Sequence, residues 1–177
     1  MIRIRVATCL DLDDVREIHL CAFPESEKQI VSTLAVNLLS EEASPKTISL
    51  VAEADGAAVG HIAFSPVTVN NNKSWKGYIL APLGVKLEYQ KRQIGSKLIE
   101  NGMERLSKMG VNVLFVYGDP KYYGKFGFSA DFASGYLPPY ELQYPFGWQA
   151  IILNEGVFIE STVKISCVDP LKDAGLW

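Results

Sequence analysis

The sequence predicts a mixed α/β fold, and three observations indicate it. Ile79–Val85 is an apolar, strand-like run, followed by a charged turn and then a helical pattern that ends near Gly110. A second apolar run, Val111–Val116, follows that helix, so we expect the two strands to be parallel neighbours joined by a helical crossover. Upstream, Asp55-Gly56 separates two strand-like runs, which predicts a β-hairpin.

The N-terminal part predicts one strand and two helices. Ile2–Val6 alternates apolar and basic side chains, as a strand with one buried face does. Apolar residues at helical spacing predict a helix from about Leu12 that ends before Pro24, with Thr8–Asp11 offering N-cap residues. A second helix is expected over Glu27–Leu39.

The hairpin and the crossover helix come next. We expect strands at Thr47–Ala54 and Ala58–Val69, the second bent or ended near Pro66 because proline lacks the N–H that a central strand needs. After the turn Lys86–Gln93, one apolar face predicts a helix that stops at Gly110. Its expected inward residues are Ile94, Leu98, Ile99, Met103, Leu106 and Met109.

The C-terminal third is less regular. Gly118–Phe128 predicts a turn, a short helix and the start of a strand. Gly135–Trp148 is rich in Pro, Tyr and Gly and predicts a long loop. Short strands are expected at Gln149–Leu153 and within Gly156–Cys167.

Composition limits the class of protein. The chain has 177 residues, 48% hydrophobic and 21% charged, which predicts a single domain over residues 1–177 with a sizeable core. A net charge of -3 disfavours nucleic acid as a partner. No stretch reaches the roughly 20 apolar residues of a membrane span, and no signal peptide is evident. Three scattered cysteines without a CxxC pair predict reduced thiols in a cytoplasmic protein, and no cluster has metal-ligand spacing.

The turn before the crossover helix is the first candidate site. The amides around Gln93–Ser96 open a helix, so they have no intrahelical acceptor, and the helix dipole favours an anion there. Gly95 permits close backbone approach, while Lys91 and Arg92 add positive charge. The pattern predicts a seat for phosphate or pyrophosphate, although a helix start with a solvated charged turn has the same sequence signature.

The turn resembles motif A of the GNAT superfamily of acyl-CoA-dependent N-acetyltransferases, usually written [QR]-x-x-G-x-[GA]. Gln90 matches its first position and Gly95 its last, but Gln93 replaces the middle glycine. Leu83-Gly84-Val85-Lys86 is similar to the strand that precedes this motif, and Tyr122–Phe128 to a late Y-x-x-x-G-F motif. The resemblance covers nearly the whole chain and is greatest to the YhbS-like branch of the superfamily.

The resemblance implies a fold in which two central strands splay apart, and it implies acetyl-CoA as cosubstrate without a metal. Pantetheine would run along the strand end, and the pyrophosphate would bind the amides of the turn. The implied cofactor-binding residues are Leu83, Gly84, Val85, Gln90, Lys91, Arg92, Gln93, Ile94, Gly95 and Ser96.

The expected reaction is attack of a primary amine on the thioester carbonyl in a ternary complex, which needs oxyanion stabilisation and proton transfer. An amide near Leu83 or Gly84 is the expected oxyanion donor, since Pro82 has no N–H. Tyr123 stands where the family's general acid usually lies, although a packing tyrosine fits the same position. The general base stays open between His61, Glu53 and water.

Other interpretations remain. The missing glycine and the absence of a carboxylate in Ile79–Val85 also fit a non-catalytic acyl-CoA-binding or sensing module. Tyr136–Trp148, with Glu141 as its only acid, fits an acceptor-pocket wall or lid, a loop that covers the core, or a homodimer contact. We expect Cys21 and Cys167 to be buried structural thiols. The acceptor, a small molecule or a protein amine, is not specified by the sequence.

Overall fold

The computed structural model describes residues 1–70, 72–156, 159 and 161–177, and the chain forms two compact units. The first unit comprises Met1–Phe64, Ala81–Gly102 and Leu176; the second comprises Ser65–Leu80, Met103–Gly175 and Trp177. The boundary falls inside β3 (Ala57–Val69), β4 (Gly77–Val85) and α3 (Ile94–Lys108). The expectation of one domain therefore stays a prediction.

The first unit contains the predicted N-terminal strands. β1 (Ile2–Val6) pairs antiparallel with β2 (Ile48–Ala54), and β2 pairs antiparallel with β3. Asp55 and Gly56, at φ 51° and 80°, both adopt the left-handed conformation that a two-residue hairpin of this twist requires. The hairpin prediction is confirmed, because its two central residues supply that geometry.

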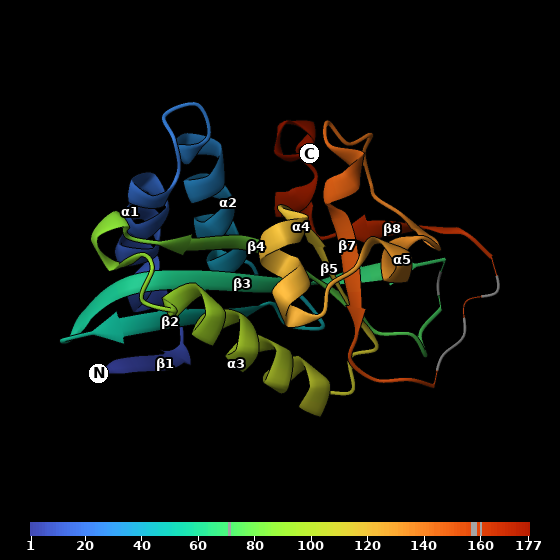
Figure 1. The fold of residues 1–177 in the computed structure, drawn as a ribbon, viewed down its shortest axis with the longest axis horizontal. Coiled ribbons are helices and arrows are strands. Elements are labelled where there is room, and N and C mark those ends of the chain that lie inside the picture. The colour runs from blue at the N-terminus through green and yellow to red at the C-terminus, as the bar shows by residue number, and fades with distance from the viewer. Residues whose placement is uncertain (71, 157–158, 160) are drawn as a thin grey trace. The chain divides into compact units, whose positions relative to one another are not determined.

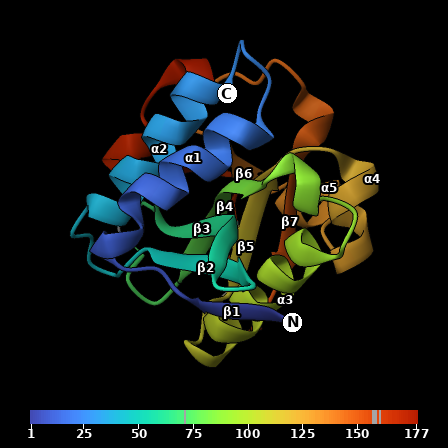
Figure 2. The ribbon, with the colours of Figure 1, turned by 90° about the vertical axis from the view of Figure 1, so that its left-hand side faces the viewer.

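Two helices of the first unit, α1 (Leu12–Ala22) and α2 (Lys28–Ser40), lie side by side in both views (Figure 1 and Figure 2). Both predicted helices are confirmed to within about two residues at each end. Their apolar faces share one buried cluster with the sheet, because the helical period aligns those residues. Its members are Ala7, Val15, Ile18, Ala35, Val51 and Ala58, with Leu39 packed against them.

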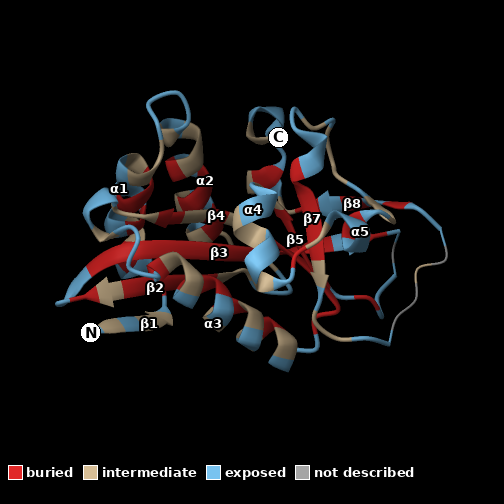
Figure 3. Cartoon of the chain, in the orientation of Figure 1, coloured by how far each residue is buried: buried red, intermediate tan, exposed pale blue. Residues whose placement is uncertain are grey.

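The crossover helix α3 lies close against β3. An ideal Cβ on Gly102 would lie 2.1 Å from the ring of Phe64, and one on Gly60 would lie 3.0 Å from Ile94 Cγ2. The helix stops before Gly110, at φ 78°, as predicted. One side of α3 is buried and the other exposed (Figure 3), but Met109 is 40% exposed, so its predicted inward position is wrong. The fully buried positions are Ile94, Leu98, Ile99 and Leu106.

In the second unit, β5 (Val113–Tyr117) runs parallel to the start of β4, as predicted. The parallel ladder ends at the pair Leu80 and Val116, whereas β4 continues to Val85. β7 (Trp148–Ile152) pairs antiparallel with β5. The short β6 (Tyr136–Leu137) runs parallel to β8 (Val163–Cys167).

The strand β3 changes partners around Pro66 instead of ending there. Its residues up to Phe64 pair with β2, and Val67–Val69 pair antiparallel with β8. Proline cannot donate to a ladder, so it is tolerated where the strand passes from one partner to the next.

Downstream of β5, two predictions needed correction. Phe128 does not start a strand, because α4 (Pro120–Tyr123) and α5 (Ala130–Ala133) flank a single bridge between Ser129 and Ala150. Secondary structure also interrupts the predicted loop Gly135–Trp148, which contains β6 and a helical turn at Pro145–Gly147. Of the predicted strand Gly156–Cys167, β8 confirms the last part, and residues 157, 158 and 160 lie outside the described residues.

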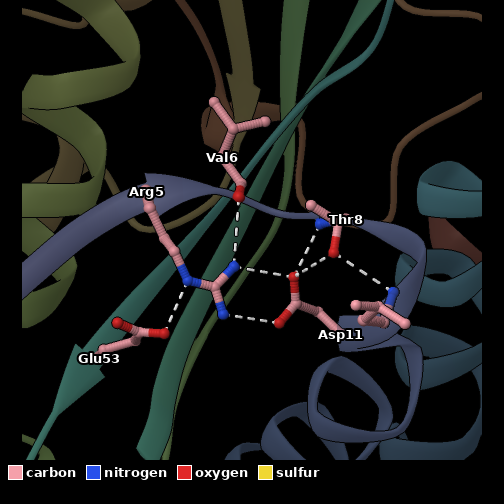
Figure 4. Close-up of polar contacts among 6 residues, drawn as sticks. Arg5, Val6, Thr8, Asp11 and Glu53 are labelled. Atoms are coloured by element: carbon pink, nitrogen blue, oxygen red, sulfur yellow. Dashed lines mark hydrogen bonds and ion pairs between the residues drawn. The ribbon is translucent and has the colours of Figure 1, made fainter. Parts of the chain in front are cut away.

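A guanidinium connects β1, the N-cap residue of α1 and β2 in the first unit (Figure 4). Arg5 donates to both oxygens of Asp11 at 2.7 and 2.9 Å, and its Nε donates to Glu53 at 2.7 Å. Asp11 also accepts the backbone N–H of Thr8 at 2.7 Å. The hydrogen bond from Arg5 is the main cause that lowers the pKa of Asp11 to about 2. Asp11 is 5% exposed, so this bidentate pair stabilises the fold more than a surface ion pair would.

Asp11→Asn should lower the free energy of unfolding by about 2 kcal/mol at pH 7, because it leaves Arg5 without its bidentate partner. The folded-state pKa lies below the unfolded value, so the stabilisation is present above pH 4 and is lost as pH falls towards 2. Urea denaturation at several pH values measures it. Asp169→Asn, at an exposed pair with Lys172, is the control and should change little. Equal losses in both variants would contradict the prediction.

Candidate active site

The turn after β4 is closed by its own hydrogen bonds. The Lys86 N–H donates to Val59 O at 2.9 Å, which anchors the start of the turn on β3. A helical turn, Leu87–Tyr89, follows, and the Gln90 side chain donates through Nε2 to Val85 O at 3.0 Å. The first residue of the predicted motif therefore connects the turn to the end of β4.

Two residues of this turn have left-handed backbones. Lys91 lies at φ 61° and Gln93 at φ 62°, a region that residues other than glycine rarely adopt. The motif that the turn resembles has glycine at the position of Gln93. The chain keeps the backbone conformation that glycine allows, while a side chain occupies the position at a conformational cost of about 1 kcal/mol.

The first amides of α3 are oriented for an anion. The Lys97 N–H donates to Gln93 O at 3.0 Å, the first bond of the helix. The amides of Ile94, Gly95 and Ser96 precede it, so they have no acceptor within the helix. Lys91 and Arg92 are exposed, and the Arg92 guanidinium lies 5.2 Å from the Tyr89 ring centroid. Unpaired amides at the positive end of the helix dipole, with two cations beside them, can bind phosphate groups.

The strand end Leu83–Val85 lies in the same unit as the turn. Leu83 and Val85 are half-buried, while Gly84 is buried against α1. An ideal Cβ on Gly84 would lie 2.7 Å from His19 Nδ1, so no larger residue fits unless the histidine moves. The absence of a side chain at Gly84 allows β4 to pack directly on the imidazole.

Behind Gly84 lies a buried pair of histidines. His19 Nε2 lies 2.7 Å from His61 Nδ1, and His61 Nε2 lies 2.6 Å from Ser49 Oγ. Burial lowers the pKa of His19 to about 3 and that of His61 well below its usual value, so both rings are neutral. Within the described residues, His19 Nδ1 has no hydrogen-bond partner. Sequence reasoning missed this pair, although His19 stands on the apolar face of the predicted helix.

The two candidate bases from the sequence are both engaged. His61 is fully buried and both its ring nitrogens have partners. The Glu53 carboxylate forms the ion pair with Arg5. His61 cannot take a proton without breaking an existing contact, and protonation of Glu53 would neutralise its ion pair with Arg5.

Tyr123, the predicted general acid, lies in the second unit. It ends α4, where Asp119 accepts the N–H of Lys121 at 2.9 Å and Pro120 takes the first helical position. An ideal Cβ on Gly118 would lie 2.5 Å from the Tyr123 ring, which also contacts Phe128 edge-on with centroids 5.8 Å apart. Burial raises its pKa, so the phenol is protonated at neutral pH, as a proton donor must be.

Two of the cysteines differ in burial. Cys167 is buried and its thiol pKa is raised to about 12 by burial, but Cys21 is exposed, so its predicted burial is wrong. Among the described residues, no group of three or more His, Cys, Asp or Glu side chains could hold a metal ion. Within the same part of the chain, no helix is both long and apolar enough to cross a membrane.

A strand that leads into a helix start able to bind an anion, in a mixed α/β fold, is the arrangement expected of an acyl-CoA-dependent transferase. Residues 3–130 match the family model of the acetyltransferase (GNAT) domain, and the chain belongs to that family. The splayed-strand GNAT fold predicted from the motifs is thereby confirmed, as is membership of the acetyltransferase class.

Among its relatives is the N-acetyltransferase YjhQ of Escherichia coli K12, an uncharacterized protein. The two are 35% identical over 165 residues, which cover 90% of this chain and 88% of YjhQ. The crystal structure of YhbS from Escherichia coli in complex with CoA has a TM-score of 0.83 at 22% identity, covering 97% and 92% of the two chains. A GNAT acetyltransferase of Brucella melitensis, solved with acetyl-CoA, has a TM-score of 0.69 at 26% identity, covering 96% and 97%.

The buried histidines should make the protein acid-sensitive. Their folded-state pKa values lie below the unfolded value near 6.5, so only the unfolded state takes up protons as pH falls from 6.5. Stability should be constant above pH 7 and should fall below pH 6 by up to about 2.7 kcal/mol per pH unit, the value for two protons. Urea denaturation across this range, with His19→Leu as comparison, measures it. The variant should show about half the slope, and an unchanged slope would contradict the prediction.

The left-handed Gln93 predicts opposite effects of two substitutions. Gln93→Gly should leave stability unchanged or raise it by up to about 1 kcal/mol, since glycine adopts this conformation without strain. Gln93→Val should lower stability by about 1 to 2 kcal/mol, because a β-branched residue is strained there. Thermal unfolding compares the two. Equal stability of both variants would mean that the backbone at this position is not left-handed.

Proposed function

We propose that this chain transfers an acetyl group from acetyl-CoA to a primary amine by direct attack in a ternary complex. The observation that carries the proposal is the turn Gln90–Ser96, in which left-handed Lys91 and Gln93 lead into the unpaired amides of α3. Membership of the GNAT family supports acetyl-CoA as the donor. The complexes of YhbS with CoA and of the Brucella melitensis protein with acetyl-CoA support the same cosubstrate.

The CoA pyrophosphate would bind the amides of Gln93, Gly95 and Ser96, with Lys91 and Arg92 balancing its charge. Ile94 would contribute the amide between them, and Gln90 would hold the turn against Val85. Pantetheine would run along Leu83–Val85, the strand end that leads into the turn. The preserved left-handed conformation at Gln93 supports this placement despite the missing glycine.

In the proposed reaction the amine nitrogen attacks the thioester carbonyl, and the N–H of Leu83 or Gly84 stabilises the tetrahedral oxyanion. The C–S bond then breaks and the Tyr123 phenol donates its proton to the departing CoA sulfur. Water takes the proton that the amine loses, because His61 and Glu53 are both engaged by partners. The Tyr123 phenol is protonated at neutral pH and so has a proton to donate, while burial, which raises its pKa, makes it a weaker acid than a free phenol.

A second candidate is a non-catalytic acyl-CoA-binding or sensing module. The observation that favours it is the absence of any carboxylate in β4, Gly77–Val85. Such a module would bind acetyl-CoA as tightly as an enzyme does but would release no CoA with any amine.

Calorimetric titration with acetyl-CoA tests acetyl-CoA binding, which both candidate functions require. Binding should be saturable, and the double variant Lys91→Ala, Arg92→Ala should weaken it about tenfold or more, because two cations near the pyrophosphate are lost. Raising the salt concentration should weaken wild-type binding and have less effect on the variant. Absence of binding at millimolar acetyl-CoA would rule out both candidates.

Tyr123→Phe tests the chemical step. With the panel amine that gives the fastest CoA release, kcat should fall about 100-fold while acetyl-CoA affinity is unchanged, because the ring packing is kept and only the proton donor is removed. Tyr122→Phe, its neighbour on α4, is the matched control and should retain activity. Normal turnover by Tyr123→Phe would exclude this residue as the acid. No CoA release with any amine, in a protein that binds acetyl-CoA, would favour the binding module.

A further inference from the structure

The imidazole of His19 on α1 lies directly against the backbone of β4. An ideal Cβ on Gly84 would lie 2.7 Å from His19 Nδ1 and 2.9 Å from His19 Cε1. It would also lie 3.4 Å from the Cβ of Ala22, which shares a face of α1 with His19 because the two are three positions apart. The His19 side chain is fully buried, and its Nδ1 has no hydrogen-bond partner among the described residues. The ring edge that carries Nδ1 is therefore turned towards Gly84.

The opposite edge of the same ring is held by two successive hydrogen bonds. His19 Nε2 lies 2.7 Å from His61 Nδ1 on β3, and His61 Nε2 lies 2.6 Å from Ser49 Oγ on β2. The two rings meet at 90° with their centroids 5.0 Å apart. Because imidazole is rigid and planar, a hydrogen bond at one nitrogen also restricts the position of the other. Two neighbouring strands thereby determine where the His19 ring meets Gly84.

The amides at the end of β4 point alternately to the two edges of the strand, as in any β-strand. The N–H of Lys86, the residue after β4, donates to Val59 O on β3 at 2.9 Å. Two positions earlier, the Gly84 N–H is therefore directed to β3 as well. The Leu83 N–H, one position earlier again, points away from β3.

The edge of β4 that faces away from β3 is free of β5 at this point. Within the described part of the chain, the ladder between β4 and β5 ends at Leu80 and Val116. The carbonyl of Val85, which points to the same edge as the Leu83 N–H, accepts the Gln90 side chain at 3.0 Å. Of the two amides considered as oxyanion donors, the one on Leu83 is therefore directed to the unpaired edge.

We propose that His19 is a positioning residue for acetyl transfer: through its contact with Gly84 it sets the direction in which the adjacent Leu83 N–H meets the thioester carbonyl. The inference rests on the proposed function, since it concerns the oxyanion donor of that reaction. Glycine restrains its own backbone less than any other residue, so at Gly84 the restraint has to come from packing. A donor must lie about 2.7 to 3.1 Å from the oxyanion, so a small shift of the strand would weaken the stabilisation.

Infrared spectroscopy of bound acetyl-CoA, labelled with ¹³C at the carbonyl, tests the inference without an acceptor. An N–H that donates to the carbonyl lowers its stretching frequency, so the wild-type protein should shift the band below that of free acetyl-CoA. His19→Ala should lose about half of this shift or more, because Gly84 is no longer held. Its acetyl-CoA affinity, measured by calorimetry, should change less than about threefold, since the turn that would bind pyrophosphate keeps all its residues.

Two further variants separate positioning from general loosening of the fold. Val15→Ala truncates another fully buried side chain of α1, which packs in the cluster with Val51 and Ala58, and it should keep the full shift. His19→Gln keeps a polar atom within reach of His61 and should recover part of the shift. With the amine that gives the fastest CoA release, kcat of His19→Ala should fall about tenfold while KM for acetyl-CoA changes little.

Each outcome supports or overturns the inference. No lowering of the carbonyl frequency in the wild-type complex would overturn it while leaving acetyl-CoA binding intact, and so would a full shift in His19→Ala. An equal loss in Val15→Ala would show that loosening of α1 alone is responsible, and would overturn it too. If His19→Ala does not fold, Ser49→Ala replaces it, because that variant keeps the ring and removes its anchor; a full shift there would contradict the inference. Failure of acetyl-CoA to bind the wild-type protein would remove the proposed function itself.

Discussion

The close contact of α3 with β3 is the constraint on which the candidate anion site depends. Gly60 and Gly102 have no side chains, so the helix approaches the strand until Phe64 and Ile94 meet the two glycines. Because the packing is dense, a helix held at these two glycines has little freedom to move. The position of its first turn is therefore also restricted. The turn must then join β4 to a helix start whose position is fixed. The left-handed backbone conformations of Lys91 and Gln93 allow the chain to make this connection. The left-handed conformation of Gln93 persists despite its cost in free energy, because the helix cannot move to relieve the backbone strain.

The opposite face of β4 is shaped by a buried polar group. His19 and His61 are neutral and hydrogen-bonded, and they place an imidazole edge directly beneath Gly84. A buried neutral histidine pair is stable at neutral pH only because each ring donates or accepts within the chain Ser49–His61–His19. The result is a strand end with packing helices on one face and a glycine where a side chain would project.

Much of the fold was predictable because its signals are local. The strand Ile2–Val6, the Asp55-Gly56 turn and the apolar stripe of α3 each depend on a few neighbouring residues, and each appears in the structure. The predicted alternation of β1 fails at its end, because Val6 is 51% exposed and Arg5 is half-buried. Predictions failed where distant segments decide the outcome. Met109 has the right spacing for the buried stripe but is exposed at the helix end, and Phe128 lies between two helical turns instead of in a strand. The candidate cofactor turn was found because its motif is contiguous.

The sequence by itself determined the order of strands and helices, the family motif and the identity of a charged turn before a helix, since these follow from spacing along the chain. Only the tertiary structure decided that Gln93 keeps the backbone of a glycine, that His61 is paired with a residue 42 positions away, and that Glu53 is held by Arg5. It also placed Gly118 against the Tyr123 ring and paired the Gly118 N–H with Gly147 O. The physical reason is that a contact between remote segments depends on how sheets and helices pack, and packing leaves no periodic signal in the sequence.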